Sequence, residues 1–137
     1  MHTDASGLVV LDRDVCLQLL RGHPVHVGRV GICGADGQPL VMPVNYHLDG
    51  ETIVFRTESQ SVISDHAGGS RIAFEVDDVD PAWREGWSVL VQGRADRVTD
   101  VEELHRLREL PLRPWAPGSH PLYVRITPED ISGRRIV

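Results

Sequence analysis

The strongest constraint on the fold is a series of apolar, β-branched runs that begins at Val25 and is cut by turn residues. Asp-Gly pairs at Asp36-Gly37 and Asp49-Gly50 separate the first three runs, and such pairs are strong β-hairpin signals. The predicted strands cover residues 25–33, 39–48, 52–57, 71–76, 87–99 and 122–126, with a further extension over 131–137. The pattern predicts a mostly β fold, a six-stranded antiparallel barrel with peripheral helices.

Short helices and two local features complete the predicted layout. Helices are expected over residues 11–21, 59–67 and 100–110. Gly93 predicts a β-bulge in its strand, and residues 77–81 are expected to form an acidic loop. The chain shows no repeat and no alternation of strands with long helices, so a Rossmann-type domain is not expected.

Length and charge limit the classes of function. The 137 residues suit one domain, predicted as 1–137 with a flexible N-terminus over 1–10. Acidic residues number 20 against 14 basic ones, all arginine, and the net charge of -6 disfavours nucleic acid as a partner. Cys16 and Cys33 lack the spacing of a redox pair, and neither a secretory segment nor a membrane span is evident. We therefore expect a cytoplasmic protein without a membrane partner.

The familiar catalytic and metal-binding patterns do not occur in the sequence. It contains no nucleophile elbow, no phosphate-binding P-loop and no zinc-protease helix. The seven histidines never take the spacing of a closed zinc site, so no metal is predicted. The sequence gives hydrolase chemistry no support.

One strand-to-helix junction and one loop could contact a ligand. Arg56 ends a strand, and Thr57 and Ser61 lead toward a helix, so guanidinium, hydroxyl and amide groups could meet a phosphate there. On these residues alone, an ordinary capped junction with a surface arginine is the simpler interpretation. Trp115 stands in a proline-stiffened loop, where it could contact a ligand or a second subunit, or fill the core.

Several segments together resemble a known family. The matching blocks are Pro43-Val44-Asn45-Tyr46, Val54-Phe55-Arg56-Thr57, Ala73-Phe74-Glu75-Val76-Asp77, Gly86-Trp87-Ser88-Val89-Leu90-Val91-Gln92-Gly93, Pro114-Trp115-Ala116-Pro117-Gly118 and Ile131-Ser132-Gly133-Arg134-Arg135-Ile136. In this order they resemble the pyridoxamine 5'-phosphate oxidase-related, FMN-binding split-barrel proteins of actinobacteria. The resemblance covers about residues 11–137.

The resemblance implies a split β-barrel that forms a homodimer with FMN at the subunit interface. It implies an oxidoreductase acting on a small molecule, and it identifies no catalytic side chain, although Tyr46 and His47 are candidate proton donors by position. The Trp87 strand and the Trp115 loop would come from the facing subunit. The implied cofactor-binding residues are Pro43, Val44, Asn45, Tyr46, Arg56, Thr57, Ser61, Val62, Trp87 and Trp115.

The phosphate-binding segment departs from the family pattern. Relatives commonly carry glycine and lysine where this chain has Gln60 and Val62. Losing one charged phosphate contact costs about 1.5–3 kcal/mol, or roughly 10–150-fold in affinity. No second basic cluster beside Arg56 is evident in the sequence, so oxidation of pyridoxamine phosphate itself is not expected.

Three hypotheses remain open from the sequence. The first is an FMN-dependent oxidoreductase. The second keeps the fold but uses a deazaflavin or haem. The third is a dimeric flavin-binding protein without turnover, which the residues Gln60 and Val62 favour.

Overall fold

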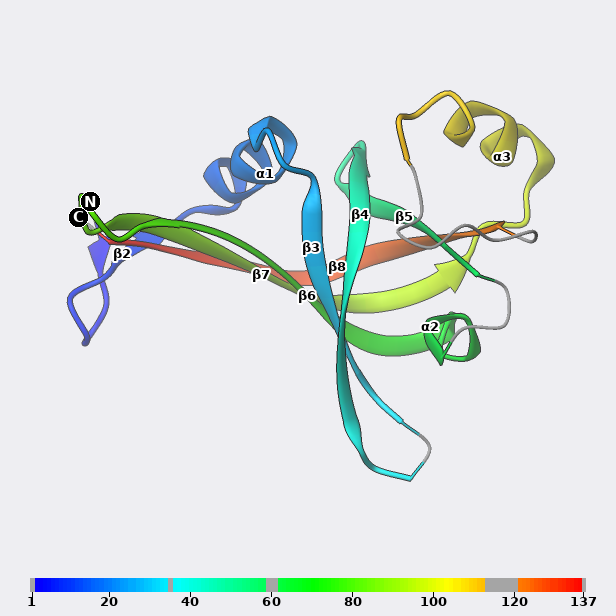
Figure 1. The fold of residues 1–137 in the computed structure, drawn as a ribbon, viewed down its shortest axis with the longest axis horizontal. Helices are drawn as coiled ribbons and strands as arrows, with labels where there is room; N and C mark the ends of the chain where they lie inside the picture. Colours follow the sequence, from blue (N-terminus) through cyan, green and yellow to red (C-terminus); the bar gives the residue numbers. More distant parts are fainter. Residues whose placement is uncertain (1, 35, 59–61, 113–120, 137) are drawn as a thin grey trace.

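Six long antiparallel strands close into a ring in the computed structural model, which describes residues 2–34, 36–58, 62–112 and 121–136. The ring runs β8-β5-β4-β3-β6-β7 and closes because β7 also pairs with β8 (Figure 1). The strands are β3 (Val27–Cys33), β4 (Pro39–Asp49), β5 (Thr52–Glu58), β6 (Gly68–Asp80), β7 (Glu85–Arg97) and β8 (Pro121–Ile136). The predicted fold class, a six-stranded antiparallel split barrel, is confirmed.

Alternation along the strands fills the barrel. On β6, Ile72, Phe74 and Val76 are buried, whereas Glu75 and Asp77 between them are only half-buried. Successive strand residues face opposite sides of a sheet, so the first set points into the barrel and the second set points outward. The apolar side therefore drives ring closure, and the other side is left for polar groups.

Helix α1 (Arg13–Gly22) packs against the barrel. Asp12 caps it by accepting a hydrogen bond from the Val15 amide at 2.9 Å, as the sequence suggested for an acidic residue near the start. Cys16 and Leu20 on its inner face are fully buried in the barrel core. The observed helix begins and ends within two residues of the helix predicted over 11–21.

Helix α3 (Val101–Leu107) builds a second, smaller apolar cluster on the outside of the barrel. Its Leu107 packs with Val54 of β5 and Tyr123 of β8, and Asp100 caps the helix as predicted. Asp49 fastens the helix to the barrel because its carboxylate binds both Arg106 of α3 and Arg125 of β8. These arginines hold the pKa of the Asp49 carboxyl below its usual value through direct hydrogen bonds.

Three segments differ from the sequence-based layout. The predicted acidic loop is wrong, because residues 77–80 pair with the start of β7 and continue β6 to Asp80. The predicted break before residue 131 is also wrong, since β8 is one strand. Helix α2 (Val62–Asp65) ends two residues before the predicted end of the helix over 59–67, and residues 59–61 lie outside the described residues. A pattern of alternating apolar residues does not predict the end of β6, because residues 77–80 are mostly charged.

The predicted bulge at Gly93 is confirmed, since the pairing of β7 with β8 shifts register between Gln92 and Gly93. A Cβ atom there would overlap the carbonyl oxygen of Thr127, so only glycine fits this close approach. Where a flexible N-terminus was expected, β1 (His2–Thr3) pairs with β2 (Val9–Leu11), which in turn pairs with β8.

No helix in the described ranges is long and apolar enough to cross a membrane. Both cysteines are free thiols; Cys16 is buried and Cys33 is exposed.

Candidate functional site

Strand β4 presents two of its four predicted site residues to the outside. Pro43 is exposed and Asn45 is half-buried, whereas Val44 and Tyr46 are 5% and 1% exposed and belong to the core. A ligand lying along the outer side of β4 could therefore meet the side chains of Pro43 and Asn45 but only the backbone of the other two.

Tyr46 is fixed in the core and is not available as a proton donor to an outside ligand. Its hydroxyl donates a hydrogen bond of 2.7 Å to the carbonyl of Leu20, which ties β4 to α1. Burial raises the pKa of Tyr46 to about 12. His47 is half-buried, and its ring lies edge-on to His26 at 5.1 Å. Tyr46 therefore does not exchange a proton with an outside ligand near neutral pH.

Arg56 lies where β4 and β5 part. The last paired residues of the two strands are Tyr46 and Phe55, and Asn45 and Arg56 each stand one residue beyond that pair. Phe55 points into the core, so the next side chain, Arg56, points to the outer side together with Asn45. The structure therefore brings these two predicted residues to the same corner of the barrel.

The Arg56 guanidinium enters a hollow of about 380 Å³, here called the Arg56 pocket, between β5, β8 and α3. The guanidinium carbon lies 5.6 Å from the centre of the Tyr123 ring, and one terminal nitrogen is 3.4 Å from the Leu112 carbonyl oxygen. The Nε atom is buried and has no hydrogen-bond partner in the described structure. The pocket is lined by Arg56, Val98, Leu104, Arg108, Leu122 and Tyr123.

A second arginine in this pocket was missed by the sequence analysis. Arg108 follows α3 directly and lies far from Arg56 in the chain, so only the folding of α3 onto β5 and β8 brings the two together. The side chain of Arg108 has no salt-bridge partner among the residues described, while Arg106, two residues earlier, is bound to Asp49. An arginine near the C-terminus of a helix also stabilises that helix. The sequence therefore could not distinguish a ligand-binding role of Arg108 from this ordinary structural one.

The Arg56 pocket fits the phosphate of a nucleotide cofactor. An arginine Nε that is buried without an acceptor costs free energy unless an acceptor arrives, and two guanidinium groups around one hollow repel each other without an anion. Guanidinium forks match phosphate oxygens in geometry and charge. Thr57 follows Arg56 at the end of β5 and is half-buried. The donor set here therefore suits a phosphate group.

The other predicted phosphate and interface residues are only partly described. Ser61, Gln60 and Trp115 lie outside the described residues, and Val62 begins α2. Their expected roles stay predictions.

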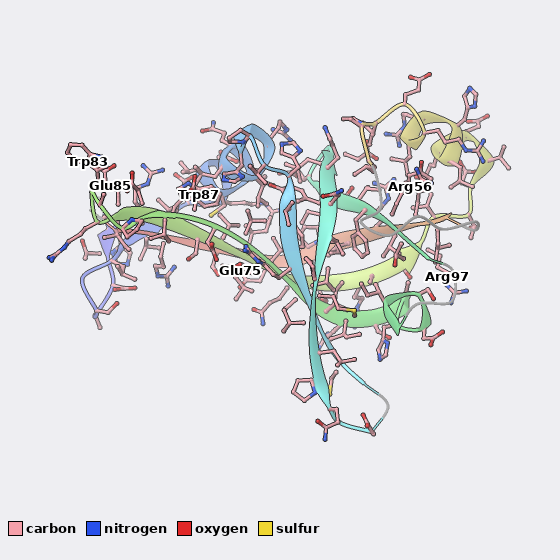
Figure 2. The ribbon with its side chains drawn as sticks, in the orientation of Figure 1. Arg56, Glu75, Trp83, Glu85, Trp87 and Arg97 are labelled. Atoms are coloured by element: carbon pink, nitrogen blue, oxygen red, sulfur yellow. The ribbon has the colours of Figure 1, made fainter. Side chains whose placement is uncertain are left out.

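Trp87 lies far from Arg56 within one chain. Figure 2 shows the two side chains on opposite sides of the β3–β4 pair, with Trp87 beside α1. Its ring meets the ring of His23 edge-on, with centres 5.4 Å apart, and His23 is close to Asp78 at 3.2 Å. A single chain thus does not bring Trp87 to the Arg56 pocket.

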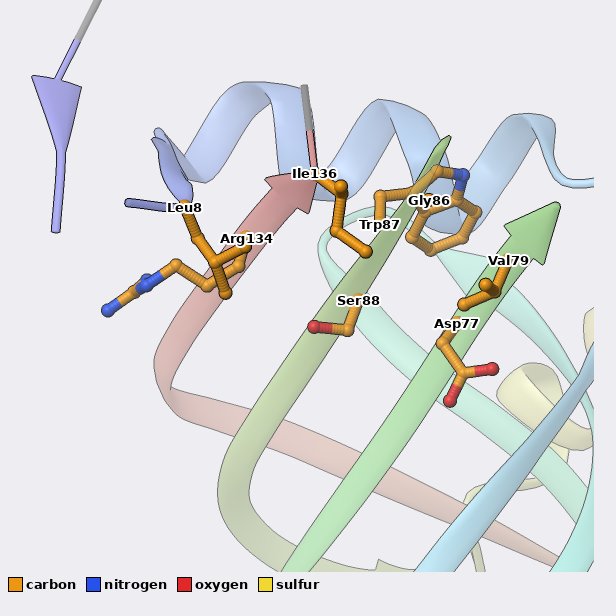
Figure 3. Close-up of a pocket in the computed structure, with 8 residues that line it drawn as sticks. All are labelled: Leu8, Asp77, Val79, Gly86, Trp87, Ser88, Arg134 and Ile136. Carbon is orange, nitrogen blue, oxygen red and sulfur yellow. The ribbon is translucent and has the colours of Figure 1, made fainter. Parts of the chain in front are cut away.

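A second hollow, of about 240 Å³, lies beside Trp87 at the end of the β6–β7 ribbon (Figure 3). Its polar groups come from Asp77, Ser88 and Arg134, and Arg134 is bound to Asp4 at 2.9 Å. The apolar lining consists of Leu8, Val79, Gly86, Trp87 and Ile136. Among the described residues, no three histidine, cysteine or acidic side chains gather as a metal site.

Glu75 and Asp77 form an acidic pair on the outer side of β6. Burial raises the pKa of Glu75 to about 7, and a hydrogen bond to Asp77 acts in the same direction. Arg29 of β3 lies 3.7 Å from Glu75 and 3.8 Å from Asp77, which partly offsets the repulsion. Glu75 therefore keeps its proton to a higher pH than an ordinary glutamate does.

We expect Glu75→Gln to stabilise the fold above neutral pH. The raised pKa means that the stability Glu75 contributes is fully present below about pH 4.5 and is lost as pH rises through about 7. Because the side chain is 34% exposed, solvent screening reduces the effect to roughly 1 kcal/mol. Urea unfolding at about pH 5 and about pH 8 measures the difference.

The gain should appear at the higher pH and vanish at the lower one. Glu85→Gln, at an exposed carboxylate at the start of β7, is the control and should not reproduce it. An equal gain at both pH values would contradict the protonation of Glu75 in the fold.

Comparison with known proteins agrees with this geometry. An uncharacterized protein of Mycobacterium tuberculosis, Rv0080, is 38% identical over 97% of this chain and 88% of its own length. The structure of an FAD binding protein from Mycobacterium smegmatis superimposes with a TM-score of 0.79, at 31% identity, over 94% of this chain and all of the other. The FAD and heme binding protein from the same organism shares the fold at 18% identity, with a TM-score of 0.69, over 90% of this chain and 70% of the other.

The ring of six strands, opened where β4 and β5 part, defines a split-barrel protein. Residues 12–135 match the family described as pyridoxamine 5'-phosphate oxidase. The chain belongs to this family, as its sequence blocks indicated.

Proposed function

We propose that this protein binds FMN and acts as a flavin-dependent oxidoreductase on a small molecule. The observation that carries the proposal is the Arg56 pocket, where a buried guanidinium nitrogen without an acceptor lies at the same corner as Asn45 of β4. Membership of the family and the likeness to an FAD binding protein support a flavin nucleotide as the ligand.

The site residues of β4 and β5 would hold different parts of the cofactor. Arg56 would bind the phosphate, with Thr57 beside it, while Asn45 and the backbone of residues 43–46 would border the flavin ring. When bound, the flavin supplies the redox chemistry, and the protein supplies orientation and polarity. Because the Tyr46 hydroxyl is hydrogen-bonded to the Leu20 carbonyl, any proton that the reaction needs must come from solvent, substrate or another side chain.

Titration of the purified protein with flavins tests this proposal directly. FMN, FAD, a deazaflavin and haemin are added separately, and flavin fluorescence and visible absorbance report binding. Tightest binding of FMN would support the proposal. A protein that binds none of the flavins would overturn it, and tightest binding of FAD, the deazaflavin or haemin would replace FMN by that cofactor.

A flavin-binding protein without turnover is the second candidate. Gln60 and Val62, in place of the glycine and lysine common in relatives, favour it because a weakened phosphate grip suits loose storage as well as catalysis. Anaerobic addition of NADH or NADPH to the flavin-loaded protein separates the two. Bleaching of the flavin supports the oxidoreductase, and a flavin that these donors leave oxidised favours the binding protein.

We also propose a homodimer that completes the site. Trp87 and Arg56 are far apart in one chain, so a flavin that contacts both would have to lie between two chains (Figure 2). The β3–β4 hairpin projects from the barrel in Figure 1, and its Val41 is 70% exposed, which suits an interface. Sedimentation over a concentration series should show a dimer, whereas a monomer at all concentrations would contradict it.

A cytoplasmic location is part of the same proposal. It is supported by the two free cysteines, which are typical of proteins kept in a reducing compartment.

A further inference from the structure

We propose that Arg108 supplies the second cation for the phosphate end of the flavin nucleotide, in the place of the lysine that relatives carry at the position of Val62. This inference rests on the proposed function. It assigns a binding role to a residue outside all the sequence blocks that resemble the family.

The position of Arg108 on the chain directs it toward the Arg56 pocket. Leu104 and Arg108 are four residues apart at the end of α3, a spacing that places them on the same side of the helix, and both line the pocket. Arg106 lies on another side, where it binds Asp49 and fastens the helix. Arg106 therefore has a structural role, and Arg108 is left to meet a ligand.

The positive charge gathered at the Arg56 pocket favours an anionic ligand there. The chain carries a net charge of -6, yet two arginines line one hollow, and the other lining residues that the structure describes, Val98, Leu104, Leu122 and Tyr123, carry no charge. Two guanidinium groups facing the same hollow form a positive site that attracts an anion and that an anion stabilises. Arg108 is exposed, the Nε of Arg56 is buried, and both arginines line the pocket, so a phosphate that enters the pocket could contact both.

The shared ligand chemistry is a phosphate ester, from the monophosphate of FMN or the diphosphate of FAD. Riboflavin, which has the same ring and no phosphate, isolates the contribution of the phosphate. If Arg108 binds the phosphate, its loss must weaken the two nucleotides and leave riboflavin unaffected.

The experiment compares dissociation constants of FMN, FAD and riboflavin for the wild type, Arg108→Gln and Arg13→Gln, by quenching of flavin fluorescence. Arg13→Gln is the matched control, because it removes one positive charge from an exposed arginine on α1. We expect Arg108→Gln to weaken binding of the preferred nucleotide about 10-fold, with riboflavin and the control unchanged. The nucleotide that loses more affinity identifies the phosphate source.

Each result has one meaning. Equal losses for riboflavin and nucleotides, or no loss for either, would overturn the role of Arg108 while leaving flavin binding intact. A wild type that binds no flavin would instead contradict the proposed function itself.

A rescue variant tests whether Arg108 replaces the lysine that relatives carry at the position of Val62. Val62→Lys, added to Arg108→Gln, places a lysine where relatives carry one and should recover most of the lost nucleotide affinity. Recovery that also appears for riboflavin, or no recovery, would show that Arg108 does not take the place of that lysine.

Discussion

Phe74→Ala is expected to lower the free energy of unfolding by about 3–5 kcal/mol. Phe74 is fully buried on the inner side of β6, and its ring meets that of Tyr46 at 74° with centres 5.1 Å apart. Truncation removes this aromatic contact and leaves a cavity that a closed barrel cannot collapse around. Urea unfolding followed by tryptophan fluorescence measures the loss.

Gly28 of β3 leaves space in the core for the ring of Phe74. A Cβ atom on Gly28 of β3 would overlap the Phe74 ring, so Gly28→Ala alone should destabilise the fold by about 1–3 kcal/mol. In a Phe74→Leu background the added methyl group occupies vacated space, and the cost should become smaller. Val79→Ala, at an exposed position of β6, the strand that carries Phe74, is the control. A cost of Gly28→Ala that is the same in both backgrounds would contradict the contact.

The closed ring could be predicted from the sequence because short-range signals determine it. Asp49-Gly50 fixes the β4–β5 hairpin, and Gly93 marks the bulge that lets β7 and β8 close the ring. Residues 77–80 carry three aspartates and are poor strand formers, and they extend β6 only because β7 pairs with them. That pairing is a tertiary effect, which local propensity does not contain.

The candidate site was only half predictable for a similar reason. Arg56 and Thr57 lie next to each other near the end of β5, which is a local pattern that indicates a phosphate site. Arg108 reaches the same pocket only because the apolar side of α3, with Leu107, packs on Val54 and Tyr123. The sequence also left Tyr46 open as a proton donor, and only its distance of 2.7 Å to the Leu20 carbonyl removes it from that role.

Arg56→Gln is expected to weaken FMN binding roughly 10–150-fold, the effect of removing a charged, partly buried contact to phosphate. Arg56→Lys should fall between this variant and the wild type, since it keeps the charge but loses the planar fork and the Nε donor. Isothermal titration with FMN and with riboflavin measures the effect. Riboflavin should bind all three proteins equally, because it lacks the group that Arg56 holds.

The stability of the cofactor-free protein separates binding from folding. Arg56 donates one long hydrogen bond of 3.4 Å to Leu112 and stacks on Tyr123, but its buried Nε lacks an acceptor in the described structure. These contributions oppose each other, so Arg56→Gln should change the free energy of unfolding by less than about 1 kcal/mol. A larger loss of stability with unchanged FMN affinity would make Arg56 a structural residue and would place the phosphate elsewhere. The unpaired Nε of Arg56 predicts the opposite result, in which Arg56→Gln loses FMN affinity and keeps its normal stability.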